Sequence, residues 1–170
     1  MEIKIKCLNG TNDVKIIKKG EWIDLYAADT VKLEAPTQTV ENIIEFDSYM
    51  INLGIAAELP SGYEAIVAPR SSTFKHFGII LANSIGIIDN SYCGIHDEWM
   101  CPVIRCNPES QIVINKGDRI CQFRIQLSQK ATLWQKLKWL LSSGVKIVNV
   151  DKDKWDKTND RGGFGSTGVK

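Results

Sequence analysis

Short apolar runs alternate with turn residues over most of the chain. In the first run, Ile3, Ile5 and Cys7 alternate with charged residues, which is the period-two pattern of a strand with one buried face. Further apolar runs follow at residues 50–57, 63–68, 77–82, 99–106, 111–114 and 120–127. Turn residues such as Asn9-Gly10 and Pro60-Ser61-Gly62 separate them. The pattern predicts an all-β fold, either a barrel or a jelly roll.

One segment follows the helical period instead. Thr132 is a suitable N-cap, and Ser142-Ser143-Gly144 ends the run. Between them, apolar residues recur at helical spacing: Leu133, Trp134, Leu137, Leu140 and Leu141. We therefore predict one short helix at residues 132–142, with its apolar face packed on the sheet. The alternative is that this face binds a protein partner.

The chain changes character at Asn159, because four glycines occur in its last ten residues. Such a segment cannot form a packed core, but Arg161 and Phe164 stand among the glycines and suit contact with a ligand. We expect one β-barrel domain at residues 1–158, followed by a flexible glycine-rich C-terminal arm at residues 159–170. The arm is expected to become ordered on a ligand.

Composition narrows the function classes. The chain has 170 residues, a formal net charge of +1 and 44% hydrophobic residues, which fits one globular domain and gives no broad basic field for nucleic acid. The N-terminus lacks the apolar core of a signal peptide, and no apolar run is long enough to span a membrane. Five scattered cysteines form no C-x-x-C pair. We expect a cytoplasmic enzyme or small-ligand binder.

Residues 69–73, Pro-Arg-Ser-Ser-Thr, place an arginine and three hydroxyls on one turn at the end of a predicted strand. Arg70 offers a bidentate fork for phosphate oxygens, and the Ser71 and Ser72 hydroxyls complete an anion site. Ser and Thr also simply cap turns, so this motif does not decide the function by itself.

The segment at residues 83–94 begins with an apolar run, which predicts a strand that ends at Asp89. A turn and then Tyr92 follow within the same segment. A partly desolvated carboxylate in this position is a candidate general base, and the tyrosine offers a flat wall against a ring. The alternative is a hairpin turn in which Asp89 bonds its own backbone.

Two weaker segments contribute a single polar residue each. At residues 116–123, Ile120 and Gln122 are expected to share one strand face, opposite Cys121 and Phe123. At residues 23–28, Asp24 lies between apolar residues near the start of a strand.

Together and in this order, these four segments and the glycine-rich arm resemble the five motifs of the trimeric dUTP diphosphatase (dUTPase) family, of the type seen in Gram-positive bacteria and their phages. The likeness runs from about residue 21 to the C-terminus. The resemblance implies a jelly-roll-like β-barrel, a homotrimer with shared active sites, and Mg²⁺-dependent hydrolysis of dUTP to dUMP and pyrophosphate. Such an activity limits uracil incorporation into DNA and supplies dUMP for thymidylate synthesis.

The resemblance also implies residue roles. Asp89 would activate the water that attacks the α-phosphate, and Tyr92 would pack on deoxyribose. Uracil would be read by Asn83 and by the hairpin backbone at Gly86 and Ile88. Phosphate oxygens would be held by Arg70, Ser71, Ser72 and Gln122. Mg²⁺ would be bound by the triphosphate, and Asp24 would contact the ion through water. From the arm, Phe164 would stack on uracil, and Arg161, Ser166 and Thr167 would bind the γ-phosphate. Gly165 would also contact the substrate.

The resemblance further implies that three copies build each site. One copy would supply Asp24, Arg70 and Gln122, a second Asp89 and Tyr92, and a third its arm. The chain departs from the family at Trp22-Ile23, where small residues are usual, and at the shortened Arg-Gly-Gly-Phe of the arm. Residues 34–46 and 132–142 look like insertions, and the inserted helix is where a regulatory protein partner would bind.

Three other activities compete with this interpretation. A dCTP deaminase of the same fold needs an acid in the site, but Glu98 is offset by one residue from the expected position, which Trp99 occupies. Cys93, His96, Cys101 and Cys106 are too loosely spaced to be typical of zinc ligands. A Ser-His-Asp hydrolase that used Ser71 or Ser72 with His76 lacks the nucleophile-elbow spacing.

Overall fold

The computed structural model describes residues 1–8, 21–38, 41, 44–107, 111–142, 144–151, 154–155, 159–164 and 168. Strands dominate this part of the chain. The elements in chain order are β1 (Glu2–Cys7), β2 (Ile23–Tyr26), β3 (Val31–Glu34), β4 (Thr37–Gln38), β5 (Ile44–Glu45), β6 (Ser48–Asn52), β7 (Ile55–Glu58), β8 (Tyr63–Pro69), α1 (Thr73–Phe77), β9 (Ile79–Leu81), β10 (Gly86–Asp89), β11 (Met100–Arg105), β12 (Gln111–Ile114), β13 (Arg119–Leu127), α2 (Leu133–Leu140) and β14 (Lys146–Val150).

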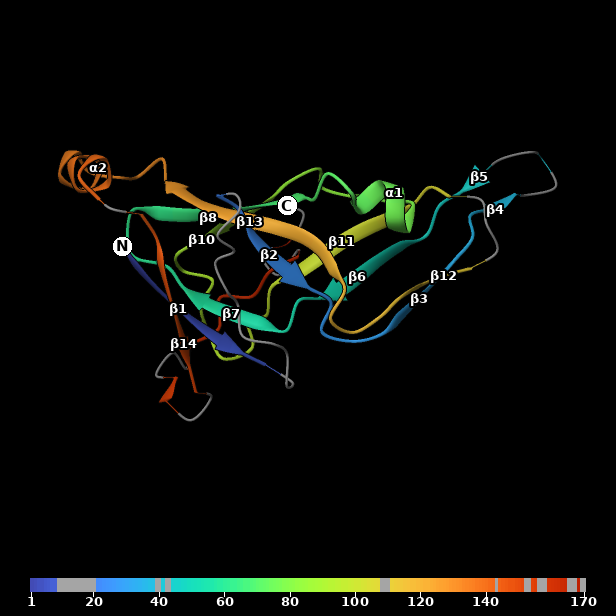
Figure 1. Ribbon diagram of the computed structural model, residues 1–170, viewed down its shortest axis with the longest axis horizontal. Helices are drawn as coiled ribbons and strands as arrows, with labels where there is room; N and C mark the ends of the chain where they lie inside the picture. The colour runs from blue at the N-terminus through green and yellow to red at the C-terminus, as the bar shows by residue number, and fades with distance from the viewer. Residues whose placement is uncertain are drawn as a thin grey trace.

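The strands form small sheets wrapped around one core. The largest has the order β10-β8-β13-β2, and two three-stranded sheets have the orders β14-β1-β7 and β6-β11-β9. The pairs β12-β3 and β4-β5 extend the structure at one end, and α2 lies at the opposite end (Figure 1). Every pairing is antiparallel except that of β1 with β14 in the described part of the chain.

The core draws side chains from all three larger sheets. Trp99 and Phe123 are fully buried and meet edge to face, with ring centroids 5.2 Å apart. Ile3 and Ile5 of β1 are buried as their alternation with charged residues predicts. This core fixes β8, β10 and β13, the strands whose ends carry the chemistry-bearing residues.

Two predicted runs are divided in the structure. Residues 50–57 form no single strand, because Gly54 has a left-handed backbone (φ 67°) and the chain passes from β6, paired with β11, to β7, paired with β1. Phe77 belongs to the short helix α1, which the sequence pattern did not predict. This helix ends at Gly78 (φ 58°), and strand β9 begins only at Ile79.

Strand β13 departs from strict alternation at its start. The register with β2 shifts between Arg119 and Cys121, and Ile120 and Cys121 are both buried. The predicted opposition therefore holds for Gln122 against Cys121 and Phe123, but the register shift interrupts it at Ile120. The pattern also missed β14, whose partner β1 lies at the other end of the sequence.

Helix α2 forms where the sequence predicts it, and Thr132 and Gln135 cap it reciprocally: the Thr132 hydroxyl accepts from the Gln135 N–H, and Oε1 of Gln135 accepts from the Thr132 N–H. The expectation that its apolar face packs on the sheet is wrong. Leu133 is 84% exposed and Trp134 63%. The helix contacts β8 instead through Trp139, 5.6 Å from Tyr63 between ring centroids, and through the Gln135 carbonyl, which accepts from the Tyr63 hydroxyl (3.4 Å). No helix in the described residues is long and apolar enough to cross a bilayer.

Candidate functional site

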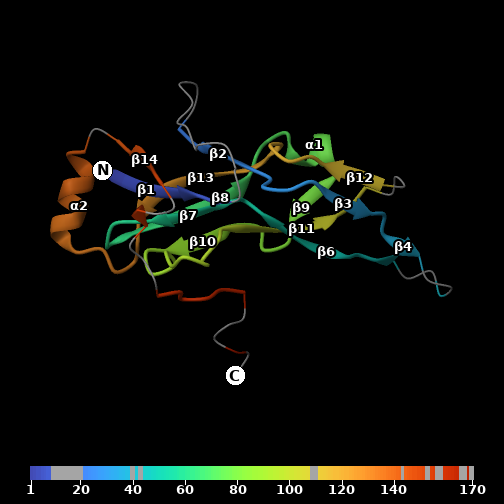
Figure 2. The same cartoon turned by 90° about the horizontal axis from the view of Figure 1, so that it is seen from below.

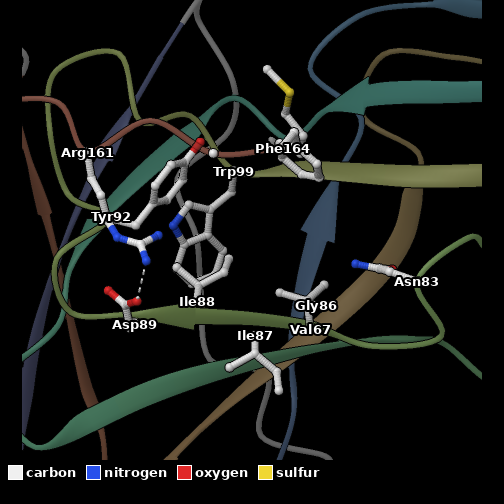
Figure 3. Close-up of a pocket in the computed structure, with 12 residues that line it drawn as sticks. Val67, Asn83, Gly86, Ile87, Ile88, Asp89, Tyr92, Trp99, Arg161 and Phe164 are labelled. Atoms are coloured by element: carbon white, nitrogen blue, oxygen red, sulfur yellow. Dashed lines mark ion pairs between the residues drawn. The ribbon is translucent and has the colours of Figure 1, made fainter. Parts of the chain in front are cut away.

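A pocket lies over β10 where residues 83–94 and the C-terminal arm meet (Figure 3). The hairpin expected at residues 83–94 is not formed: β10 pairs with β8, and in the described residues no strand after its turn pairs with it. The lining of the pocket comes from β8, the segment at residues 83–92, the start of β11 with the residue before it, and the arm: Val67, Asn83, Gly86, Ile87, Ile88, Asp89, Tyr92, Trp99, Met100, Arg161, Gly163 and Phe164. The structure thus brings together seven residues that the sequence assigned to the site, which are Asn83, Gly86, Ile88, Asp89, Tyr92, Arg161 and Phe164.

Strand β10 forms the floor of the pocket and is held by β8. Gly86 pairs with Val67, and Asp89, at the other end of the strand, pairs with Glu64. Asn83 stands in the turn before β10, where Ser84 takes a left-handed backbone (φ 60°). The floor therefore carries an amide at one end and a carboxylate at the other (Figure 3).

The sequence left two interpretations open for Asp89: a residue that stabilises its own turn and a candidate base facing a ligand. Its two oxygens have different surroundings, one for each interpretation. Its Oδ1 accepts a hydrogen bond from the Ser91 N–H (2.9 Å) and another from the Ser91 hydroxyl, so it does brace its own turn. Its Oδ2 faces the pocket and meets Nη2 of Arg161 at 3.2 Å. Partial burial raises the pKa of Asp89, but the Ser91 hydrogen bonds and the Arg161 charge outweigh it, and the net pKa is lowered.

Tyr92 forms one wall. Its hydroxyl donates to the carbonyl of Glu98 (2.9 Å), which fixes the ring. Burial, followed by the nearby acids Asp97 and Glu98, raises the pKa of Tyr92, so the phenol stays protonated and keeps this bond. Gly163 lies flat on the ring, since a Cβ there would be 3.2 Å from Tyr92 Cε2.

Sequence reasoning missed several lining residues, among them Val67, Trp99 and Met100. Trp99 is buried, and its indole N–H has no hydrogen-bond partner among the described residues. Strand alternation identifies Trp99 and Val67 only as core residues, because they pack inward like any other apolar residue of a strand. Their place beside the pocket depends on where the arm lies.

The described part of the arm lies on the pocket of its own chain. Arg161, Gly163 and Phe164 line this pocket, whereas the family resemblance predicts that the arm serves a neighbouring copy. In Figure 2 the arm runs along the β10 side of the molecule. Gly165, Ser166 and Thr167, also assigned to the site, lie outside the described residues.

A second polar cluster forms around Asp24 on β2. Its carboxylate pairs with Arg70 (Nε to Oδ1, 2.7 Å) and with Arg119 (Nη1 to Oδ2, 3.1 Å), and its side chain is 9% exposed. Gln122 is the partner of Asp24 in the β-ladder and donates from Nε2 to the carbonyl of Pro69 (3.1 Å). The sequence predicted Asp24, Arg70 and Gln122 here but not Arg119.

In the turn after β8, a threonine and not a serine caps the backbone. Thr73 closes this turn: its Oγ1 accepts from the Arg70 N–H (3.0 Å) and donates to the carbonyl of Ile120 (2.8 Å). Ser72 stands at the N-cap of α1 but makes no side-chain cap bond, and Ser71 is exposed. Turn capping was the alternative to anion binding for this motif. Because Thr73 does the capping, the anion-binding interpretation remains open for Ser71 and Ser72.

The two clusters lie at opposite ends of β8. Asp89 is the ladder partner of Glu64, near the start of the strand, while Arg70 follows its last residue, Pro69. The six residue-to-residue steps from Glu64 to Arg70 span about 20 Å at the rise of an extended strand. One chain therefore holds the general-base candidate and the phosphate-binding candidates far apart.

The alternative sites find little support in the geometry. Glu98 accepts a hydrogen bond from the Gly54 N–H (2.9 Å) and does not line the pocket, whereas Trp99 does. No three His, Cys, Asp or Glu residues of the described part gather as metal ligands, and that includes the loosely spaced Cys93, His96, Cys101 and Cys106. The five cysteines all lie in the described residues, and none of them forms a disulfide.

Asp24 is the single carboxylate of its cluster, and both of its oxygens already face arginines. One carboxylate cannot enclose a metal ion. It does suit Mg²⁺, which keeps several waters and is commonly held by one or two carboxylates together with substrate phosphates.

Comparison with known proteins places the chain among enzymes of one kind. The dUTPase family model matches residues 23–138. The SPbeta prophage-derived deoxyuridine 5'-triphosphate nucleotidohydrolase YosS of Bacillus subtilis (strain 168) is 42% identical over 171 residues, covering 100% of both chains.

Two solved structures share the fold. The dUTPase of Streptococcus mutans matches with a TM-score of 0.62 and 17% identity over 76% of this chain and 98% of that one. A mutant dUTPase from phage phi11 of Staphylococcus aureus, which coordinates a structural Mg(II) ion, matches with a TM-score of 0.59 and 18% identity over 77% of this chain and 94% of that one. The predicted all-β, jelly-roll-like barrel is confirmed.

Proposed function

The chain belongs to the dUTPase family, and we propose that it hydrolyses dUTP to dUMP and pyrophosphate. The observation that carries the proposal is the pocket over β10, which places the Asp89 carboxylate at one end and the Asn83 amide at the other, with Tyr92 beside the carboxylate. This arrangement matches a nucleoside lying along β10 with its phosphate directed toward Asp89.

Asp89 acts as the general base. Its Oδ1 is held by Ser91, so Oδ2 alone is directed at the attacking water. Arg161 covers Oδ2 in the ligand-free chain and transfers to the phosphates of the substrate, because the triphosphate carries more negative charge than one carboxylate. The freed Oδ2 takes a proton from water, the water oxygen bonds to the α-phosphorus, and the bond to pyrophosphate breaks.

Strand β10 and the turns on either side of it select the base and the sugar. Asn83 and the backbone at Gly86 and Ile88 hydrogen-bond to uracil, and cytosine would leave some of these groups unpaired. Tyr92 is fixed by Glu98 and packs on the deoxyribose, where it leaves no room for a 2′-hydroxyl. Phe164 of the arm stacks on the base from the open side.

The active sites are shared between copies of the chain in a homotrimer. The separation of about 20 Å along β8 supports this proposal, because Arg70 and Asp89 of one chain cannot both reach one α-phosphate. Asp24, Arg70, Ser71, Ser72 and Gln122 of one copy hold the phosphates over the Asp89 and Tyr92 of another.

Mg²⁺ is the proposed cofactor. Asp24 and the triphosphate would hold the ion, with Asp24 acting through water because both of its oxygens already face Arg70 and Arg119. When bound, the ion neutralises charge on the leaving pyrophosphate. Arg70 and Gln122 orient the phosphate oxygens.

The deciding experiment measures pyrophosphate release from each common ribo- and deoxyribonucleoside triphosphate, with and without Mg²⁺. We expect release from dUTP alone, dependent on Mg²⁺, with dUMP as the other product. Deamination of dCTP, or equal turnover of dTTP and dUTP, would contradict the proposal. The activity would limit uracil incorporation into DNA and supply dUMP in the cytoplasm, where cysteines without disulfides, such as those of this chain, stay reduced.

A second role is proposed for α2. Its exposed apolar residues form a surface that the described part of the fold leaves uncovered: Leu133, Trp134, Leu140 and Leu141. We propose that this surface binds a regulatory protein partner through an apolar segment of that partner. Removal of residues 132–142 should abolish such binding and leave dUTP hydrolysis intact, whereas loss of both would show that the helix serves folding.

A further inference from the structure

An arginine that the sequence did not assign shares the Asp24 carboxylate with Arg70. Arg119 is the first residue of β13, and its Nη1 lies 3.1 Å from Oδ2 of Asp24. The other oxygen, Oδ1, lies 2.7 Å from Nε of Arg70. Each carboxylate oxygen therefore has its own guanidinium. The proposed reaction uses Asp24 and Arg70 directly and gives Arg119 no part.

The backbone at Arg119 also contacts the turn that carries Arg70. The register of β13 against β2 shifts between Arg119 and Cys121, and the Arg119 carbonyl accepts from Nη1 of Arg70 (3.4 Å). The next carbonyl, that of Ile120, accepts from the Thr73 hydroxyl, which closes the same turn (2.8 Å). This irregular start of β13 therefore places Arg119 beside Arg70 through both its main chain and its side chain.

The three charged side chains differ in exposure and sign. Asp24 is 9% exposed, Arg70 22% and Arg119 46%. Solvent screens a carboxylate weakly when it has so little contact with water, so Asp24 offsets most of the charge of Arg70. The Asp24–Arg70 pair alone has no net charge, and a phosphate group would gain little from binding it. With Arg119 the cluster keeps one net positive charge.

Asp118 is the acid next to Arg119 in the sequence, and it has a separate role. Its Oδ2 accepts the N–H of Asn115 at 2.8 Å, which closes the turn before β13. In the part of the chain that the structure describes, the ion pair of Arg119 is made with Asp24 and not with Asp118. The charge of Arg119 is therefore directed to the phosphate-binding cluster.

We propose that Arg119 is a positioning residue for phosphate binding, which offsets the charge of Asp24 so that Arg70 remains attractive to a phosphate. This inference rests on the proposed function, in which Arg70 binds the phosphates. Arg70 uses Nε for Asp24 and Nη1 for the Arg119 carbonyl. Its Nη2 has no protein partner among the described residues and is the group that a phosphate oxygen would meet.

Binding of inorganic tripolyphosphate in EDTA tests this role without Mg²⁺ and without turnover. Arg119→Gln should weaken the affinity about tenfold, because the cluster loses its net positive charge. Arg119→Lys keeps the charge and should bind much more tightly than Arg119→Gln. Isothermal titration calorimetry at low ionic strength measures both. Unchanged binding in Arg119→Gln, or equal losses in the two variants, would overturn the proposal.

A double variant that restores the net charge separates this role from a structural one. Asp24→Asn combined with Arg119→Gln removes one charge of each sign, so the charge of Arg70 is no longer offset. Tripolyphosphate affinity in EDTA should then return to within about threefold of the wild type. A loss that persists in the double variant would show that Arg119 only supports the fold around Asp24, and the proposal would fail.

Arg124 provides a matched control on the same strand. It is exposed like Arg119, and its guanidinium carbon lies 5.3 Å from the centroid of the Trp22 ring. Five steps along β13 separate it from Arg119 by about 17 Å. Arg124→Gln removes the same charge from the chain and should leave tripolyphosphate binding unchanged. Equal losses in Arg119→Gln and Arg124→Gln would show a general effect of net charge and overturn the local role.

Kinetics with dUTP and Mg²⁺ test the same role in turnover. Arg119→Gln should raise KM for dUTP about tenfold and change kcat by less than about twofold, because the lost interaction is one of binding and Asp89 is untouched. A fall in kcat at unchanged KM would count against the proposal. A wild-type chain that binds tripolyphosphate but does not hydrolyse dUTP would contradict the proposed function and not the role of Arg119.

Discussion

The Arg161 guanidinium lies against the Asp89 carboxylate, with Nη2 3.2 Å from Oδ2, although the two residues belong to separate motifs. Both side chains are about half exposed, so the pair is weak enough to exchange with a ligand. It joins the arm to the proposed general base in the ligand-free chain. The charge of Arg161 also helps to keep Asp89 ionised.

Arg161→Gln should therefore move the acid limb of the kcat/KM profile to higher pH. The free enzyme loses a positive charge that lowers the pKa of Asp89, so the base becomes protonated at a higher pH. The acid limb of the kcat profile should not move, because Arg161 has transferred to the phosphates in the enzyme–substrate complex. A parallel shift of both limbs would mean that Arg161 remains on Asp89 during turnover.

Ser91→Ala should raise the pKa of Asp89 in both states. The Ser91 hydroxyl donates to Oδ1 and lowers this pKa, and the alanine retains only the backbone donor. A base works when it is deprotonated, so activity in the variant should fall away at a higher pH than in the wild type. Profiles of kcat and kcat/KM measured from neutral pH downward check the shift, and unchanged profiles would exclude Asp89 as the titrating base.

Asp89→Asn should lose about 10²–10⁴ in kcat, which is the usual contribution of a general base. Binding of a nonhydrolysable dUTP analogue should persist, since the amide still accepts from Ser91 through its oxygen. Steady-state kinetics and calorimetric titration measure the two effects separately. Turnover close to wild type would refute the assignment.

Tyr92→Ala should increase the turnover of UTP relative to dUTP, because the wall against the 2′ position is removed. Tyr92→Phe keeps the ring and loses only the bond to Glu98, so it should retain discrimination at a cost of about 1 kcal/mol in stability. The ratio of kcat/KM values for the two substrates and a thermal denaturation curve distinguish the variants. An unchanged ratio in Tyr92→Ala would place sugar selection elsewhere.

Removal of Mg²⁺ by EDTA should abolish most hydrolysis without changing the Tm of the ligand-free protein. Asp24 is already neutralised by Arg70 and Arg119, so the fold does not depend on the ion. A nonhydrolysable dUTP analogue should raise the Tm more in the presence of Mg²⁺ than in its absence. A large drop in Tm on addition of EDTA alone would point to a structural metal instead.

Local patterns predicted most elements correctly where the determining contacts are close in sequence. β1, β12 and the Thr132 cap of α2 follow from alternation and capping chemistry alone. Elements that depend on partners distant in sequence were not predicted. An example is β14, which forms by pairing with the edge of β1. The exposure of Leu133 was mispredicted for the same reason, since an amphipathic pattern shows a face but not what covers it.

The sequence by itself determined which reactive and binding groups this protein has and their order along the chain. They are an arginine with serines on a turn, a carboxylate and a tyrosine after an apolar strand, and a glycine-rich arm. Only the tertiary structure decided which of these groups meet. Strand pairing is non-local, and it sets Asp89 and Arg70 at opposite ends of β8. The buried carboxylate of Asp97 accepts hydrogen bonds from the backbone N–H groups of Arg161 and Gly162, which no sequence pattern predicts. These bonds hold the arm where Arg161 pairs with Asp89.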